Sequence, residues 1–184
     1  MVTAAAARGP FGSLAADVLA RAARIRLVLT DCDGVLTDGG VLCSAYGEEM
    51  VRFDRRDGMG VERLKALAGI ETGIVTRERS EITARRAAKI GIRELHLGVL
   101  DKAAVLENVA GKYGLTPERI AFLGDDVNDV PALGRAGLAG CPADAFEAAR
   151  EAAHYVCRAP GGHGAFREFA ELVLHAVLRE MPGR

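Results

Sequence analysis

The sequence contains no tryptophan, and aromatic residues make up only 5% of its 184 positions. Nucleic-acid binding usually relies on a basic surface or on aromatic side chains that stack with bases, and a net charge of −1 provides no basic excess. No apolar run approaches the roughly 20 residues that span a bilayer. The composition therefore predicts a protein that binds neither nucleic acid nor membranes.

The four cysteines are widely spaced and form no CxxC pair. This spacing argues against a zinc site or a disulfide framework and favours reduced thiols. The opening ten residues are small and weakly basic and lack the longer apolar region of a secretory signal. We therefore expect a cytoplasmic protein with a disordered tail over residues 1–10 and a single domain over 11–184.

Short apolar strands alternate with helices along most of the chain. Strands are indicated by aliphatic and β-branched runs, and helices by apolar residues at helical spacing, several of them ended by glycine. This alternation predicts an α/β fold with a central parallel sheet covered on both faces. The expected strands are 25–30, 72–76, 94–97, 120–123, 138–140 and 155–157. The expected helices are one ending at Arg24, then 60–68, 80–90, 102–113, 129–136, 143–152 and 166–178, with a hairpin flap at about 40–53.

Acidic and hydroxylic residues stand where the predicted strands end. Asp31 and Asp33 follow the first strand, Thr76 ends the next strand of the core, Lys102 follows the third, and Asp125 follows the fourth. Because ligands collect at the carboxyl ends of parallel strands, these side chains are expected in one crevice. Converging carboxylates repel each other unless a cation joins them, and aspartate oxygens suit Mg²⁺.

A magnesium site of this kind would bring a phosphate group beside an aspartate. The predicted chemistry is attack by a carboxylate on phosphorus, giving an aspartyl-phosphate that water hydrolyses. Phosphoryl transfer needs positioning and neutralised charge, so Thr76 is expected to bind phosphate, Lys102 to offset its charge, and backbone amides around Gly34 to cradle it. The alternative of a calcium-binding loop fails, because no glutamate stands at the twelfth position.

These motifs, in this order, resemble the haloacid dehalogenase superfamily of aspartyl phosphotransferases, from about Ile25 to the last helix. The resemblance implies a three-layer Rossmann-like core in which Asp31 is the nucleophile and Asp33 the general acid and base. It also implies that Mg²⁺ is held by the side chains of Asp31 and Asp125 and by the backbone carbonyl of Asp33. The residues expected to support the metal site are Asp126, Asn128 and Asp129.

A narrower resemblance joins residues 26–38, 53–58, 124–126 and 161–168 to a capless subfamily. That subfamily contains 3-deoxy-D-manno-octulosonate (KDO) 8-phosphate phosphatases and the 9-phosphate phosphatases of nine-carbon keto-deoxy sugar acids, namely KDN and the sialic acids (N-acylneuraminates). The chain length agrees, because the core leaves no room for a cap domain. The resemblance implies a homotetramer built by the hairpin, in which a neighbouring subunit helps close the active site. It also places Arg56 and Asp57 in the substrate pocket and residues 161–164 over a pocket.

The second motif departs from the octulosonate pattern. Those enzymes usually have Thr-Gly-Arg, whereas this chain has Thr76-Arg77-Glu78, which is closer to the nine-carbon enzymes. Glu78 would accept hydrogen bonds from sugar hydroxyls, and Arg86 and Lys89, three positions apart on one helix, would hold the substrate carboxylate. A surface ion-pair cluster is the competing interpretation. The expected substrate is a phosphorylated 2-keto-3-deoxy sugar acid, with the nine-carbon 9-phosphate preferred over octulosonate 8-phosphate.

Two other functions are compatible with such a domain. The first is a non-catalytic module that binds a sugar-acid cytidylyltransferase, which the complete set of acidic motifs argues against. The second is a phosphotransferase or mutase, which is disfavoured because mutases usually shield the phosphoenzyme from water and this chain has no cap.

Overall fold

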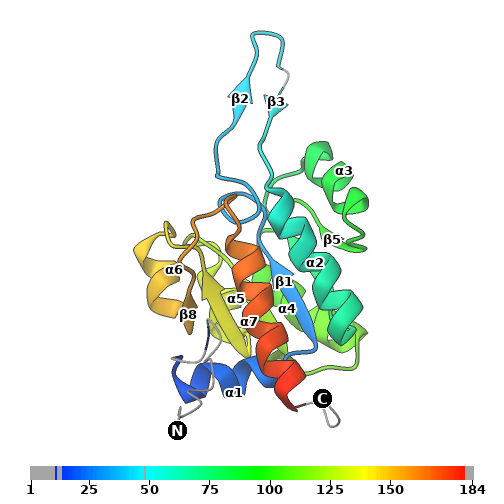
Figure 1. The fold of residues 1–184 in the computed structure, drawn as a ribbon. Coiled ribbons are helices and arrows are strands. Elements are labelled where there is room, and N and C mark those ends of the chain that lie inside the picture. Colours follow the sequence, from blue (N-terminus) through cyan, green and yellow to red (C-terminus); the bar gives the residue numbers. More distant parts are fainter. Residues whose placement is uncertain (1–10, 12–13, 48, 181–184) are drawn as a thin grey trace, which may run out of the picture.

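A parallel sheet of six strands forms the centre of the protein, for which a computed structural model describes residues 11, 14–47 and 49–180 (Figure 1). The tail predicted over 1–10 lies outside these residues. The strands stand in the order β5-β4-β1-β6-β7-β8, and every neighbouring pair is parallel. Their bounds are β1 (Leu27–Thr30), β4 (Glu71–Val75), β5 (Glu94–His96), β6 (Ile120–Leu123), β7 (Leu138–Cys141) and β8 (Tyr155–Val156). The predicted α/β class is confirmed.

Helices cover both faces of this sheet (Figure 1). The side chains of β1 alternate between two separate cores, with Val28 in one and Leu27 and Leu29 in the other, because successive side chains of a strand point to opposite faces. One face carries α1 (Ala16–Arg24), α2 (Arg55–Ala68), α3 (Glu81–Lys89) and α7 (Ala165–Glu180). The other carries α4 (Lys102–Lys112), α5 (Val130–Arg135) and α6 (Glu147–Ala152), and a short 3-10 helix (Pro117–Arg119) precedes β6.

A hairpin projects from the body between β1 and α2, at the top of Figure 1. Its strands β2 (Leu42–Cys43) and β3 (Glu49–Met50) pair antiparallel, and a bridge between Thr37 and Phe53 closes its base. The hairpin flap predicted at about 40–53 is therefore present. Its apolar side chains are largely exposed, including Leu42 at 68% and Tyr46 at 93%. Exposed apolar side chains gathered in one place mark an interaction surface.

Two helix boundaries differ from the sequence prediction by four residues or more. Helix α2 begins at Arg55 rather than at residue 60, because the Asp54 carboxylate caps it by accepting the N–H of Arg56 at 2.7 Å. Helix α6 begins at Glu147, so the helix predicted from residue 143 was wrong over its first turn. Residues 143–146 are not helical. The N–H of Phe146 instead donates to the carbonyl of Asp125, in the loop that follows β6, at 2.9 Å.

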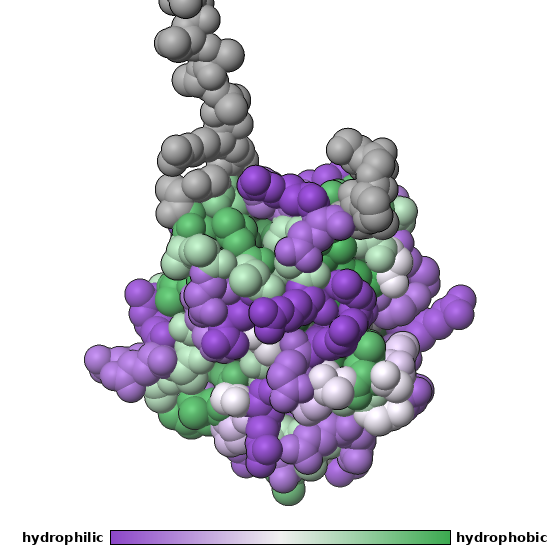
Figure 2. Space-filling view, turned by 90° about the horizontal axis from the view of Figure 1, so that it is seen from below, coloured by the Kyte–Doolittle hydropathy of each residue, from purple (hydrophilic) through white to green (hydrophobic). Residues whose placement is uncertain are grey.

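The surface at the end of the molecule opposite the hairpin is largely hydrophilic (Figure 2). Hydrophilic side chains form a broad band across it, with smaller apolar groups between them. Within the described residues, no helix combines the length and apolar character that crossing a membrane requires. At the other end of the molecule the chain runs from β1 into the hairpin (Figure 1).

Candidate active site

The loops that follow β1, β4 and β6 enclose a small cavity. Its volume is about 190 Å³. Asp31 and Asp33 reach it from the end of β1, and Asp125 from the end of β6, as expected for neighbouring parallel strands. The lining residues are Asp31, Asp33, Thr76, Arg77, Glu78, Asp125, Asp126 and Asn128. Arg77 was not among the predicted site residues, although its position directly after Thr76 at a strand end was the available signal.

A buried lysine joins two aspartates at the floor of this site. Lys102, at the start of α4, is 2% exposed, and its Nζ lies 2.9 Å from Asp31 Oδ2 and 2.6 Å from Asp129 Oδ1. The second oxygen of Asp31 accepts the N–H of Cys32 at 2.7 Å. The cluster of Asp31, Lys102 and Asp129 is therefore an ion triad with almost no access to solvent.

Burial and like charge shift the protonation of this cluster. Burial, followed by the negative charge of Asp129, raises the pKa of Asp31 to about 8, while Lys102 acts in the opposite direction. The same two causes raise the pKa of Asp125 to about 7. Burial lowers the pKa of Lys102, but Asp31 and Asp129 outweigh it and the net direction is upward, so the lysine keeps its charge. The carboxylates thus need a further cation to ionise fully at neutral pH.

The donor atoms suit a magnesium ion. Carboxylate oxygens of Asp31, Asp125 and Asp129 lie within 4.8 Å of one another. Asp129 also accepts the N–H groups of Asp125 at 3.0 Å and Asp126 at 3.3 Å, so it holds the β6 loop in place while it binds Lys102. The Asp125 carboxylate can lie close to the backbone of Gly34, which has φ +82°, only because glycine has no Cβ. A Cβ at this position would fall on that carboxylate. Each Asp31 oxygen already has one partner but can accept a second, and together with the Asp125 carboxylate these oxygens fit Mg²⁺.

Asp33 occupies a different environment from Asp31. Its Oδ2 accepts a hydrogen bond from Thr76 Oγ1 at 3.2 Å, and the same hydroxyl accepts the N–H of Glu78 at 3.2 Å. Burial raises the pKa of Asp33, and the nearby charge of Glu78 adds to that effect. A raised pKa favours a proton on Asp33, which is what a general acid requires.

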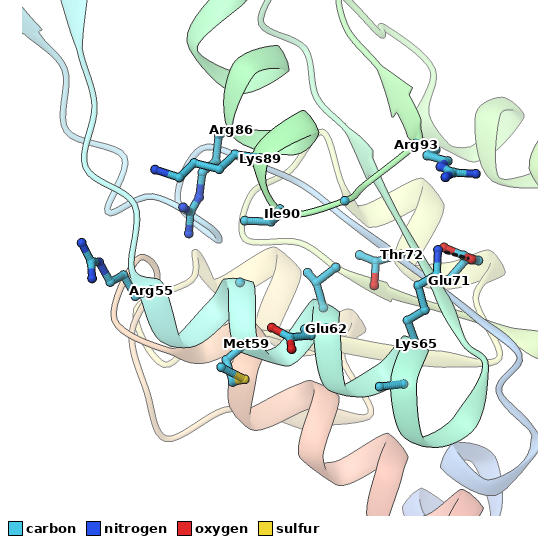
Figure 3. Close-up of a pocket in the computed structure, with 14 residues that line it drawn as sticks. Arg55, Met59, Glu62, Lys65, Glu71, Thr72, Arg86, Lys89, Ile90 and Arg93 are labelled. Atoms are coloured by element: carbon cyan, nitrogen blue, oxygen red, sulfur yellow. Dashed lines mark ion pairs between the residues drawn. The ribbon is translucent and has the colours of Figure 1, made fainter.

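Four of the predicted substrate residues lie apart from this cavity. Arg86 and Lys89 line a larger cavity of about 790 Å³ between α2 and α3, together with Thr72 of β4 (Figure 3). Within one chain, the structure therefore separates these two cations from Glu78. Arg56 is exposed and pairs with Asp54 at 2.7 Å.

Asp57 is a buried residue in the first turn of α2 and faces the start of α7. It is 2% exposed, and its Oδ1 accepts the N–H of Arg167 at 2.9 Å. Burial raises the pKa of Asp57 to about 6. In the single chain its contacts are with the backbone that begins α7, so a contact with substrate stays a prediction.

Comparisons with known proteins agree with this geometry. Residues 55–137 match the haloacid dehalogenase-like hydrolase family. The chain is 39% identical to the 3-deoxy-D-manno-octulosonate 8-phosphate phosphatase KdsC of Yersinia pestis over 166 residues, which cover 90% of this chain and 88% of that protein. A probable YrbI family phosphatase from Pseudomonas syringae superposes with a TM-score of 0.86 at 40% identity, covering 89% of this chain and 92% of that one.

A further solved structure contains ligands. The 3-deoxy-D-manno-octulosonate 8-phosphate phosphatase of Moraxella catarrhalis, in complex with a magnesium ion, a phosphate ion and KDO, superposes with a TM-score of 0.84 at 34% identity. The match covers 87% of this chain and 91% of that one. Sequence identity at this level over nearly the full length of both chains shows a common family.

The raised carboxyl pKa values predict that Mg²⁺ binds more tightly as pH rises. At pH 6, Asp31 and Asp125 hold protons that the metal has to displace, and each displaced proton changes the apparent affinity about tenfold per pH unit. We expect the apparent Kd for Mg²⁺ to fall by at least about tenfold between pH 6 and pH 8, with release of protons. Isothermal titration calorimetry in buffers of different ionisation enthalpy measures both quantities.

Two variants serve as controls for this dependence. Asp125→Asn removes one of the displaced protons, so its slope should be shallower. Asp17→Asn removes an exposed carboxylate on α1, at the other end of the molecule, and its slope should match the wild type. A Kd that stays constant from pH 6 to pH 8 in the wild type would contradict the prediction.

Proposed function

The chain belongs to the haloacid dehalogenase-like hydrolases, in the capless group of the octulosonate 8-phosphate phosphatases, and from this premise we propose that it hydrolyses a phosphorylated 2-keto-3-deoxy sugar acid through an aspartyl-phosphate on Asp31. As a member it is a phosphoric monoester hydrolase with Mg²⁺ as cofactor. The observation that carries the proposal is the buried triad of Asp31, Lys102 and Asp129 beside Asp125. The hydrolase family gives no support to the mutase or the cytidylyltransferase-binding alternative.

The proposed reaction has two steps. In the first, a carboxylate oxygen of Asp31 forms a bond to phosphorus while the bond from phosphorus to the sugar oxygen breaks, and Asp33 gives its proton to that oxygen. In the second, Asp33 takes a proton from a water molecule, which attacks phosphorus, releases phosphate and restores Asp31. Lys102 and Thr76 hold the phosphate oxygens. Asp31, Asp125 and the carbonyl of Asp33 would hold Mg²⁺, which would offset the like charge of carboxylate and phosphate.

Two sugar acids are candidates for the substrate. The relatives described above are named for the eight-carbon 8-phosphate, and their similarity supports that substrate first. Glu78 supports the nine-carbon 9-phosphate, because it lines the catalytic cavity and its backbone N–H is bound to Thr76, where a sugar hydroxyl would come close. Both candidates carry a carboxylate, which Glu78 would repel at short range.

Assembly of several copies would bring positively charged side chains to the substrate carboxylate. The cavity of about 190 Å³ is smaller than the ~300–1,000 Å³ of most small-molecule sites, so much of a sugar acid would lie outside it. We propose a cytoplasmic homotetramer joined through the exposed hairpin, in which Arg86 and Lys89 of a second copy reach the substrate carboxylate. The exposed Leu42 and Tyr46 support the hairpin as the contact.

The nucleophile is tested by Asp31→Asn. Because the amide is a far weaker nucleophile than the carboxylate, we expect Mg²⁺-dependent phosphate release to fall about 10³-fold or more. The measurement is steady-state phosphate release, with the melting temperature followed to verify folding. Asp17→Asn, on α1 at the other end of the molecule, is the control and should keep wild-type activity. Retained activity in Asp31→Asn would rule out the mechanism.

The substrate is tested by comparing kcat/KM for octulosonate 8-phosphate and for a nine-carbon 9-phosphate, in the wild type and in Glu78→Arg. If Glu78 binds sugar hydroxyls of the longer substrate, Glu78→Arg should lower kcat/KM for the 9-phosphate by about 10-fold to 100-fold. A loss of this size corresponds to the loss of one or two hydrogen bonds to the substrate. Arg79→Glu, a charge change at a neighbouring position, is the control. Equal kcat/KM for both substrates in both proteins would leave Glu78 without a part in selection.

The assembly is tested by light scattering on the protein in solution. We expect the mass of four chains, and the mass of a smaller species after Leu42→Asp with Tyr46→Asp, because charges on the hairpin make its burial costly. Leu100→Asp, at an equally exposed apolar residue outside the hairpin, should leave the mass unchanged. A wild-type monomer would contradict the assembly.

A further inference from the structure

The loop between β8 and α7, residues 158–164, is held in shape by acidic side chains. We call it the glycine loop. The Glu168 carboxylate accepts the N–H of Arg158 and that of Ala159, both at 3.1 Å, and Asp144 Oδ1 accepts the N–H of Gly161 at 2.9 Å. Charged acceptors on backbone N–H groups make strong hydrogen bonds. The glycine loop is therefore a preorganised part of the fold, although it has no regular secondary structure before α7.

The glycine loop lies against the turn that follows Asp31 and carries Asp33. We call residues 33–38 the nucleophile turn. The N–H of Gly162 donates to the carbonyl of Val35 at 2.9 Å. A Cβ on Gly161 would fall on the carbonyl oxygen of Gly34, and one on Gly162, at φ +63°, would fall on the N–H of Asp38. Only glycine allows two stretches of backbone to approach this closely.

Side chains join the same two segments to the base of the hairpin. Arg52, which follows β3, donates from Nε to Asp38 Oδ2 at 2.9 Å, and its Nη2 lies 2.7 Å from His163 Nε2. His163 Nδ1 lies 2.8 Å from the carbonyl oxygen of Gly161, which can only accept. The ring therefore donates from Nδ1, and Nε2 is left to accept from Arg52. This chain of contacts runs from Asp38 through Arg52 and His163 to Gly161.

We propose that Gly162, His163 and Arg52 are positioning residues that hold the nucleophile turn in its catalytic geometry. Inside the turn, the carbonyl of Cys32 accepts three N–H groups and the N–H of Gly34 is bound to Thr37 Oγ1 at 3.3 Å, so the turn moves as one body. The glycine loop and Arg52 fix that body against the rest of the fold. A shift of the turn moves Asp33 and Gly34 relative to phosphorus, and a misplacement of about 1 Å costs about 100-fold in rate.

This inference rests on the phosphatase chemistry proposed above and is independent of which sugar acid is the substrate. p-Nitrophenyl phosphate contacts the site mainly through its phosphate, so it reports on the turn alone. If the turn is displaced, kcat should fall for both esters, because both form the same phosphoenzyme, whose hydrolysis needs Asp33 as base. The fall should be at least as large for the sugar acid phosphate, whose alcohol also needs the Asp33 proton to leave. Wild-type hydrolysis of p-nitrophenyl phosphate tests the phosphatase chemistry on its own, so failure of the two proposals can be distinguished.

The first test is Gly162→Ala, with Gly114→Ala as a matched control. Both glycines have φ +63°, so alanine introduces the same backbone strain, but nothing lies within 4 Å of a Cβ at Gly114. We expect kcat of Gly162→Ala to fall at least about tenfold on both esters, with KM changed less than about threefold, because Thr76 and Lys102 still bind the phosphate. Gly114→Ala should keep the wild-type kcat. Activities are scaled to the folded fraction.

The second test avoids the risk that Gly162→Ala fails to fold. Arg52 has an exposed side chain, and Arg52→Met should lower kcat about threefold to tenfold on both esters without lowering the melting temperature. Arg52→Lys should recover part of the loss, and Arg85→Met, at an exposed arginine of α3, should lose nothing.

The outcomes separate the parts of the proposal. Equal kcat in Gly162→Ala and Gly114→Ala, together with equal kcat in Arg52→Met and the wild type, would overturn it. A loss in Gly162→Ala alone would overturn the part assigned to Arg52 and His163 and support the glycine loop. A loss on the sugar acid but not on p-nitrophenyl phosphate would overturn positioning for both, since it would mean a contact with the sugar.

Discussion

The contact of Lys102 with Asp31 and Asp129 is the constraint on which the site depends. All three side chains are buried, and an ion left unpaired in such surroundings costs several kcal/mol. Each comes from a different element: the end of β1, the start of α4 and the loop before α5. The three can meet only if the sheet register and the helix positions agree. The same contact therefore couples the stability of the fold to the geometry of the nucleophile.

The triad also explains why the site favours both a metal ion and a phosphate ester. The one ammonium of Lys102 faces three carboxylates when Asp125 is counted with Asp31 and Asp129. Burial and this excess of negative charge raise the pKa values of Asp31 and Asp125. Mg²⁺ relieves the excess and makes room for the further charge of phosphate. Asp33 lies outside the triad, bound to Thr76, and its raised pKa suits proton transfer. Two aspartates separated by one residue thus have different surroundings, which suit the different roles proposed for them.

The nucleophile turn is enclosed on several sides by segments distant in sequence. Gly162 contacts it from the loop before α7, and Arg52 contacts it from the base of the hairpin. The hairpin itself extends away from the body and exposes apolar side chains (Figure 1). An interface formed by the hairpin would therefore lie one ion pair away from the turn that carries Asp33. This ion pair would connect the proposed assembly with catalysis.

The sequence by itself determined the sheet, the order of its elements and most of the residues that meet at the candidate site. Short aliphatic runs bounded by glycine-ended helices identify strands, and parallel strands bring Asp31, Thr76 and Asp125 to one edge, so local pattern was sufficient. Only the tertiary structure decided the surroundings. It placed Arg86 and Lys89 in a separate cavity from Glu78, and it buried Asp57 against the N–H of Arg167, 110 positions away. Periodicity shows that a face is buried, but which segment covers that face depends on how α2, α3 and α7 pack together.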